Sequence, residues 1–162
     1  MITVELKPIK TVDEYLALSN LKVHEEQKGF SNNLESFADA FAWLEIMGDK
    51  PLVFGMYHDN IPVGLAMIVY ERAQDHGFDK LDGPIYVLWR FMIDKNHQGK
   101  GLGKAALAQV VGLIKAKKPL GEAGWLCVTV APENHPARKL YENAGFVEMG
   151  TAETDVMMHL AL

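Results

Sequence analysis

Apolar and polar residues recur with two different periods along the chain, and the period changes repeatedly. Near the N-terminus Ile2, Val4 and Leu6 alternate with polar residues, which predicts a first strand. Thr11 followed by Glu14 has the spacing of a capping box, so a helix is expected to begin after Thr11. Apolar residues then recur at helical spacing and predict two helices separated by the polar stretch 25–33. The apolar positions of the first helix are Tyr15, Leu18 and Leu21. Those of the second are Leu34, Phe37, Phe41 and Leu44, and Gly48 ends this helix.

The remaining pattern predicts strands joined by a hairpin, a loop and two further helices. Segment 124–131 is apolar on both faces, which is typical of a covered central strand. The predicted strands are 51–58 and 61–70 (a hairpin around Asp59 and Asn60), 85–93 after a polar loop over 71–84, 124–131, 146–150 and 155–162. The predicted helices are 104–115, with Ala106, Val110, Leu113 and Ile114 on one side, and 136–145, with proline at its start and Gly145 past its end. The order of elements indicates one mixed α/β domain over residues 1–162.

Composition narrows the function classes. With 162 residues, 49% hydrophobic and 23% charged, the chain is long enough and apolar enough to form one folded domain. The net charge of −5 argues against a nucleic-acid binder, which usually carries a basic face. The single cysteine, Cys127, lies in an apolar strand and has no disulfide partner, which predicts a cytoplasmic protein with a buried thiol. The N-terminus lacks the layout of a signal peptide, and no apolar run has the length of a membrane span.

The sequence QGKGLG, residues 98–103, stands between a predicted strand and a predicted helix. Amides in the first turn of a helix lack intrahelical partners and carry partial positive charge. Glycine leaves these amides accessible and tolerates unusual backbone angles, so Gly99, Gly101 and Gly103 favour the binding of a phosphate or pyrophosphate. Lys100 and Lys104 add positive charge at the rim. The alternative is a tight connection with packing glycines, which needs fewer of them.

Two nucleotide-binding motifs were compared with this loop. A nucleoside-triphosphate P-loop is excluded, because Lys104 is followed by Ala105 and Gln98 stands where the first glycine belongs. A dinucleotide fingerprint fits Gly101, Gly103 and Ala106 formally, but residues 94–98 separate the loop from its strand and the next strand ends without an acid. That fingerprint therefore stays a weak alternative.

Two motifs together resemble the GNAT superfamily of acyl-CoA N-acyltransferases. Its acetyl-CoA signature, Gln/Arg-x-x-Gly-x-Gly/Ala after an apolar strand, is matched by Gln98, Gly101 and Gly103. Its second signature, an asparagine before a helix with Leu-Tyr and a closing Gly-Phe, is matched by NHPARKLYENAGF, residues 134–146. The stretch RFMIDKNHQGKGLGKAAL, residues 90–107, also resembles bacterial spermine/spermidine (diamine) acetyltransferases. The resemblance covers nearly the whole chain and implies a mostly antiparallel mixed sheet of about seven strands flanked by about four helices.

The resemblance also implies roles for particular residues. Tyr141 occupies the position of the family's general acid, and a phenol is protonated at neutral pH. The strand residues beside pantetheine would act through their backbone, including an N–H near Met92 that stabilises the developing oxyanion. Asn134 is expected to cap its helix and to contact the cofactor. The residues expected to hold acetyl-CoA are Phe91, Met92, Ile93, Gln98, Gly99, Lys100, Gly101, Leu102, Gly103, Lys104 and Asn134.

The acceptor side is less defined by the sequence. Glu25 and Glu26 lie where this family receives the acceptor amine, but on the sequence alone a solvated loop explains them better. The better-known diamine acetyltransferases have an acid just before the apolar core of the strand, where this chain has Trp89 and Arg90, so the identity of the base stays open. Trp43, Trp89 and Trp125 are expected to pack in the core, and Trp89 is in addition a substrate-side candidate.

Three functions follow as hypotheses. The first is an acetyl-CoA-dependent N-acetyltransferase acting on a small amine, with a polyamine such as spermidine or spermine as candidate. The second is acetylation of a protein N-terminus or lysine, and the third is a non-catalytic CoA-binding or dinucleotide-binding module. The six histidines lack ligand spacing, so no metal is expected. No nucleic-acid or membrane partner is expected, and the frequency of dimers in the family implies a homodimer.

Overall fold

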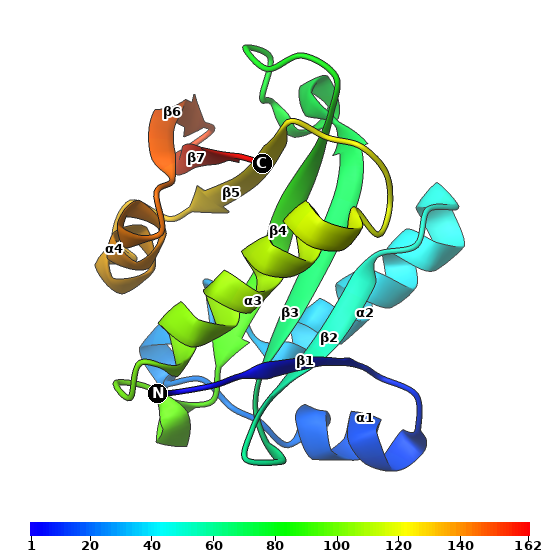
Figure 1. The fold of residues 1–162 in the computed structure, drawn as a ribbon, viewed down its shortest axis with the longest axis vertical. Coiled ribbons are helices and arrows are strands. Elements are labelled where there is room, and N and C mark those ends of the chain that lie inside the picture. The colour runs from blue at the N-terminus through cyan, green and yellow to red at the C-terminus, as the bar shows by residue number, and fades with distance from the viewer.

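Seven strands form one sheet in the order β1-β2-β3-β4-β5-β7-β6 in the computed structural model, which describes residues 1–162 (Figure 1). The strands are β1 (Glu5–Pro8), β2 (Leu52–His58), β3 (Ile61–Arg72), β4 (Pro84–Ile93), β5 (Trp125–Val130), β6 (Val147–Ala152) and β7 (Asp155–Ala161). Every neighbouring pair is antiparallel except β4 and β5, which are parallel. The predicted mixed, mostly antiparallel sheet is confirmed.

Four α-helices cover the sheet, as expected. They are α1 (Val12–Ser19), α2 (Asn33–Ala42), α3 (Leu102–Lys117) and α4 (His135–Asn143). The shorter helical turns are η1 (Glu25–Gln27), the π-helical η2 (Trp43–Met47), η3 (Ala73–His76) and η4 (Lys95–His97). No helix combines the length and the apolar character that crossing a membrane requires.

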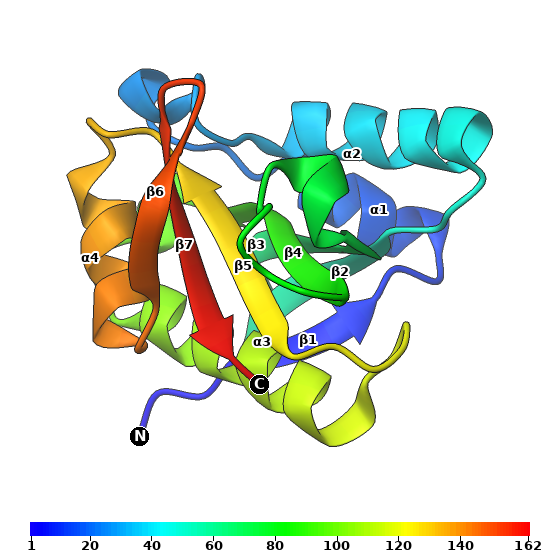
Figure 2. The same cartoon turned by 90° about the horizontal axis from the view of Figure 1, so that it is seen from above.

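The helices lie on opposite faces of the sheet (Figure 2). The largest buried cluster joins α3 and α4 to one face through residues such as Val110, Tyr141 and Leu126. Two smaller clusters lie on the other face, beneath α1, α2 and η3. Cys127 belongs to one of them, and burial raises the pKa of its thiol to about 12, which fits the expected buried thiol. Strands β3 and β4 are covered on both sides, which explains their nearly continuous apolar sequences.

Local signals in the sequence were reliable at several turns and caps. The capping box is present, since the Thr11 hydroxyl accepts from the Glu14 amide and the Glu14 carboxylate accepts from the Thr11 amide. Asp59 and Asn60 form the hairpin turn with φ of 49° and 62°, the left-handed conformation that a tight hairpin needs. Gly48 ends η2 with φ of 74°. These features depend on neighbouring residues, so the sequence alone specifies them.

The apolar stripe predicted for the second helix is the main error in the fold. The helix exists as α2 and η2, but Leu34, Phe41 and Leu44 point to solvent with exposed fractions of 74%, 66% and 48%. The buried positions in α2 are instead the polar Asn33 and Ser36. Asn33 donates from Nδ2 to the carbonyl oxygens of Leu18, Ser19 and Leu21, which caps the end of α1. Of the predicted stripe only Phe37 packs against the core, so the hydrogen bonds of Asn33 contribute to which side of α2 faces inward.

Several boundaries also differ from the prediction. The first strand begins at Glu5 and not at Ile2, because its pairing with β2 starts opposite Tyr57. Leu21 is buried but lies beyond the end of α1 at Ser19. The predicted polar loop 71–84 contains η3, and its apolar residues Ala73, Phe78 and Leu81 are buried in the core. Helix α3 starts at Leu102, two residues before the predicted start, so Gly103 is already helical.

Candidate active site

A gap in the sheet separates β4 from β5. The two parallel strands pair only at Tyr86 with Leu126 and at Val87 with Cys127, and then diverge (Figure 1). A bulge in β4 adds to the divergence. On β3, Met67 pairs with Arg90 and Ile68 pairs with Leu88, so Trp89 has no partner on β3. The edge of β4 that faces β5 therefore has unpaired backbone groups beyond Val87. Such an edge can accept the amides of a peptide-like ligand as another strand would.

The start of α3 lies at the open end of this gap. Gly99 and Gly101 have φ of 73° and 78°, a left-handed conformation that strongly favours glycine. The backbone hydrogen bond from Ala105 N to Gly101 O closes the first turn of α3. The N–H groups of the three residues before Ala105, which are Leu102, Gly103 and Lys104, have no intrahelical acceptor. This geometry creates an anion site of the kind expected from the glycine loop.

Gly103 differs from the two other glycines of the loop. Its backbone is helical, and a Cβ built on it meets Ile93 Cγ1 and Leu140 Cδ2 at 3.8 Å, which is ordinary contact. Neither conformation nor crowding within the protein therefore requires glycine here. Gly103 lines the cavity beside the loop, so the space above its Cα is available to a ligand.

Two adjoining cavities occupy the gap. The first, of about 350 Å³, lies along the end of β4 and the start of α3. The second, of about 450 Å³, continues between β4, β5 and the start of β7. The two cavities share six residues, which are Phe30, Ser31, Phe91, Asn134, Ala137 and Tyr141. We call the first the cofactor cavity, after the residues expected to hold acetyl-CoA that line it, and the second the acceptor cavity, after the substrate-side candidate Trp89.

Most residues expected to hold the cofactor line the cofactor cavity. They are Phe91, Met92, Ile93, Gln98, Gly99, Gly101, Gly103, Lys104 and Asn134. Lys100 lies outside the cavity, and its ammonium group donates to the carbonyl of Asn96 at 2.8 Å. Leu102 is 2% exposed and packs in the core, so only its backbone is available to an anion.

Tyr141 stands where the two cavities meet. It is 7% exposed, and its ring packs against Phe146 with centroids 5.4 Å apart. Burial raises the pKa of its hydroxyl well above the usual value, so the phenol stays neutral at any working pH. Asn134 lies beside it and caps α4, with Oδ1 accepting from Ala137 N at 3.3 Å. This cap leaves the Asn134 amide NH₂ free to face the cavities that the residue lines.

The glycine loop is held by residues whose role the sequence did not indicate. Gln98 and Gln27 exchange two side-chain hydrogen bonds of 2.8 and 3.1 Å, and Gln98 also donates to the carbonyl of Ile93. Asp94 is 4% exposed and accepts from the backbone amides of Lys22 and Asn96. These hydrogen bonds, and that from His97, hold the pKa of the Asp94 carboxyl below its usual value despite burial. Together they join the segment after α1 to the end of β4.

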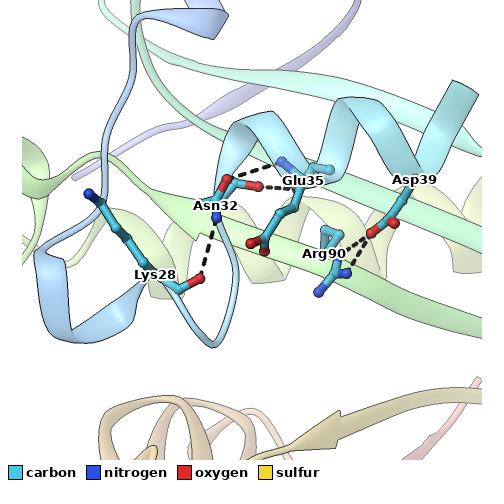
Figure 3. Close-up of polar contacts among 6 residues, drawn as sticks. Lys28, Asn32, Glu35, Asp39 and Arg90 are labelled. Atoms are coloured by element: carbon cyan, nitrogen blue, oxygen red, sulfur yellow. Dashed lines mark hydrogen bonds and ion pairs between the residues drawn. The ribbon is translucent and has the colours of Figure 1, made fainter.

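On the acceptor side, Arg90 projects from β4 toward α2 and binds Asp39 (Figure 3). Its Nε donates to Asp39 Oδ2 at 2.8 Å, and Nη2 donates to the same oxygen. Both side chains are largely buried, with exposed fractions of 22% and 30%. Trp89, the substrate-side candidate, lines the acceptor cavity, and its ring meets that of Trp43 edge-on at 4.8 Å between centroids.

Glu25 and Glu26 lie on the exposed turn η1, outside both cavities. The Glu25 side chain is 85% exposed and pairs with Lys28 at 2.8 Å. Two other acids, Glu133 and Asp155, line the acceptor cavity instead. Glu133 follows β5 and Asp155 begins β7. Neither residue belongs to a hydrophobic pattern or a motif, so the sequence did not predict them as site residues.

A further cavity of about 550 Å³ lies at the other end of β4, beside Pro84, and is separate from this site. Glu71 borders it and is in contact with His76. Burial raises the pKa of the Glu71 carboxyl to about 7, and Asp75 and Asp49 add to the increase. Burial lowers the pKa of His76. The structure contains no group of three or more metal-binding side chains.

Comparison with known proteins identifies a family. The model of the acetyltransferase (GNAT) family matches residues 18–146. The spermine/spermidine N(1)-acetyltransferase of Bacillus subtilis (strain 168) is 34% identical over 97 residues, which are 60% of this chain and 59% of that protein. The chain thus spans about three fifths of the length of the curated relatives it matches.

Solved structures share the fold at low sequence identity. The aminoglycoside acetyltransferase AAC(6')-Ib in complex with coenzyme A has a TM-score of 0.73 and 19% identity, covering 98% of this chain and 95% of that chain. The PaiA N-acetyltransferase of Thermoplasma acidophilum in complex with coenzyme A has a TM-score of 0.65 and 15% identity, covering 99% of each chain.

Proposed function

Because the chain belongs to the acetyltransferase (GNAT) family, we propose that it transfers the acetyl group of acetyl-CoA to a primary amine of a small molecule, with a polyamine such as spermidine or spermine as acceptor. The observation that carries the proposal is the position of Tyr141. It lies where a cavity bordered by free helix amides meets a second cavity bordered by carboxylates. A proton donor at this junction is what a transfer between two substrates requires.

The residues of the cofactor cavity fit acetyl-CoA. The free N–H groups at the start of α3 and the ammonium group of Lys104 suit a pyrophosphate. The unpaired edge of β4 at Phe91–Ile93 suits the amides of pantetheine. Acetyl-CoA supplies a thioester, and the transfer forms a bond between the amine nitrogen and the acyl carbon while the bond from that carbon to sulfur breaks.

The protein contributes to this transfer through proton positions and charge. Tyr141 keeps its proton because burial raises its pKa, so the protonated phenol is present to donate to the thiolate sulfur as the carbon–sulfur bond breaks. A backbone N–H of β4 near Met92 stabilises the charge that develops on the acyl oxygen. The acceptor amine must reach the site neutral, and we propose that water in the acceptor cavity receives its proton.

The choice of a polyamine rests on two supports. The matched relative from Bacillus subtilis is named for acetylation of spermine and spermidine. The acceptor cavity is also lined by two carboxylates without an ion-pair partner, Glu133 and Asp155, whereas its one cation, Arg90, is paired with Asp39. We further propose that the protein is cytoplasmic and forms a homodimer. The molar mass of the purified protein, measured by light scattering, tests the homodimer.

The function is tested by measuring thiol release from acetyl-CoA with a panel of acceptors. The panel contains spermidine, spermine, a monoamine, an aminoglycoside and a peptide with a free N-terminus, and a reaction without amine is the control. We expect release with the polyamines. Release with the peptide alone supports protein acetylation, and binding of acetyl-CoA without release to any amine supports a non-catalytic module. Binding of NAD in place of acetyl-CoA contradicts the assignment of the cofactor cavity.

A further inference from the structure

The acceptor cavity contains three charged side chains, and they differ in whether a partner within the protein neutralises them. Its one cation is Arg90 and its two anions are Glu133 and Asp155. Arg90 is bound to Asp39 through two N–H donors. Glu133 and Asp155 make no side-chain hydrogen bond and no ion pair within 4.0 Å. A ligand in this cavity therefore meets two free carboxylates and one neutralised guanidinium.

The sheet brings the two carboxylates to the same edge. Strands β5 and β7 are antiparallel, and Val130 at the end of β5 pairs with Val156. Asp155 begins β7 next to this pair, and Glu133 lies in the turn that follows β5. Both residues line the acceptor cavity, which lies where β5 has already separated from β4.

The opposite wall is formed by β4 and α2. Figure 3 shows Arg90 reaching from β4 to Asp39, with Glu35 on the same side of α2. Asp39 is not part of the cavity lining, so it neutralises Arg90 from behind. Trp89 also lines this wall, and its ring packs against Trp43.

We propose that Glu133 and Asp155 bind the second ammonium group of the acceptor, so that the protein selects diamines and longer polyamines over monoamines. The proposal rests on the acetyltransferase function above and replaces Glu25 and Glu26 as the residues that recognise the substrate. A carboxylate that lacks a partner in the protein pairs with an ammonium group without breaking any existing contact. Glu25 would first have to leave Lys28. While the distal ammonium is held, the other end of the amine can lie beside Tyr141, which lines the same cavity.

Two double variants with the same change in net charge test the proposal. Glu133→Gln with Asp155→Asn removes the carboxylates of the cavity, and Glu25→Gln with Glu26→Gln removes those of η1. The ratio of kcat/KM for a diamine to that for a monoamine of equal length is measured for both variants and for the wild type. We expect the cavity variant to lower this ratio roughly tenfold, the order expected for two partly exposed ion pairs. The η1 variant should leave it unchanged.

Salt gives a second readout from the same proteins. The ratio in the wild type should fall between 0.1 and 1 M salt, since the screening length drops from about 10 to about 3 Å. In the cavity variant it should be nearly independent of salt. An unchanged ratio in the cavity variant, or a loss in the η1 variant instead, overturns the proposal while acetyl transfer stands. If the wild type acetylates no amine, the function itself is wrong. Retained monoamine turnover shows that the cavity variant is folded.

Discussion

The cofactor cavity and the acceptor cavity meet at Tyr141 but present different groups to a ligand. The cofactor cavity offers mostly backbone, namely the amides at the start of α3 and the free edge of β4. The acceptor cavity offers side chains from separate elements, among them Trp89, Glu133 and Asp155. A backbone site needs glycine and a helix start, which leave a pattern in the sequence. A side-chain site needs only that loops converge, which leaves none. Under the proposed function, the comparison teaches that the cofactor and the acceptor are recognised by different physical means.

The largest effect is expected at the junction of the two cavities. Tyr141→Phe keeps the ring and its contact with Phe146 and removes only the hydroxyl. Turnover should fall by about 10²-fold or more, the size of effect typical of a positioned general acid. The affinity for acetyl-CoA, measured by calorimetry, should change little because the cofactor cavity is intact. Equal turnover in the variant and the wild type would mean that Tyr141 is only a packing residue.

The next effect separates backbone recognition from stability. Gly103→Ala places a methyl group in the cofactor cavity without straining the helix, and it should weaken acetyl-CoA binding about tenfold, or by about 1.4 kcal/mol. Gly112→Ala is the matched control, because Gly112 is also in α3 and has open space around it. Both substitutions should raise Tm slightly, since alanine loses less backbone entropy than glycine.

If Gly112→Ala weakens binding as much as Gly103→Ala, the methyl group is not the cause. Gly101 is a poorer site for this test, because its φ of 78° strains any other residue.

A smaller effect on KM is expected at the hydrogen bonds between Gln27 and Gln98, which connect η1 to the glycine loop. Gln27→Ala leaves the amide of Gln98 without its partner and frees the glycine loop from η1, whose following residues Phe30 and Ser31 line both cavities. The KM for acetyl-CoA and the KM for the amine should both rise about three- to tenfold, as expected for a lost pair of amide hydrogen bonds. Gln109→Ala, on the exposed side of α3, serves as control. A rise in only one of the two KM values would show that the cavities are independent.

The smallest effect should come from outside both cavities and should change stability alone. The pKa of Glu71 is raised to about 7 in the folded protein, so its contribution to stability is present below its unfolded pKa and is lost as pH rises through 7. Glu71→Gln removes this loss. The Tm difference between Glu71→Gln and the wild type should therefore increase from pH 5 to pH 8.

His76 contributes in the opposite direction, since its lowered pKa makes the fold less stable as pH falls below about 6.5. Glu45→Gln, at an exposed position without an ion pair, should show no such trend. A Tm difference for Glu71→Gln that is constant with pH, or a change in kcat/KM, would contradict this assignment.

Local pattern in the sequence was sufficient for the order of elements, the glycine loop and the caps. Strand alternation, capping boxes and glycines with positive φ are set by residues within a few positions of one another. The sequence also placed Gly99, Gly101, Gly103 and Tyr141, because a motif ties them to one loop and one helix. The structure brings all four to a single cavity.

The tertiary structure decided what the sequence left open, and the reason is the separation of the partners. The amides of Gln27 and Gln98 meet across 71 positions, and Asp94 reaches Lys22 across 72. The inward face of α2 includes Asn33, which caps carbonyl groups of α1, so the hydrophobic pattern located Phe37 correctly but misplaced the rest of the stripe. Glu133 and Asp155 face one cavity only because β5 leaves β4 after Cys127 and pairs with β7. Helical or strand period describes one element at a time, whereas these contacts exist only once the elements have packed together.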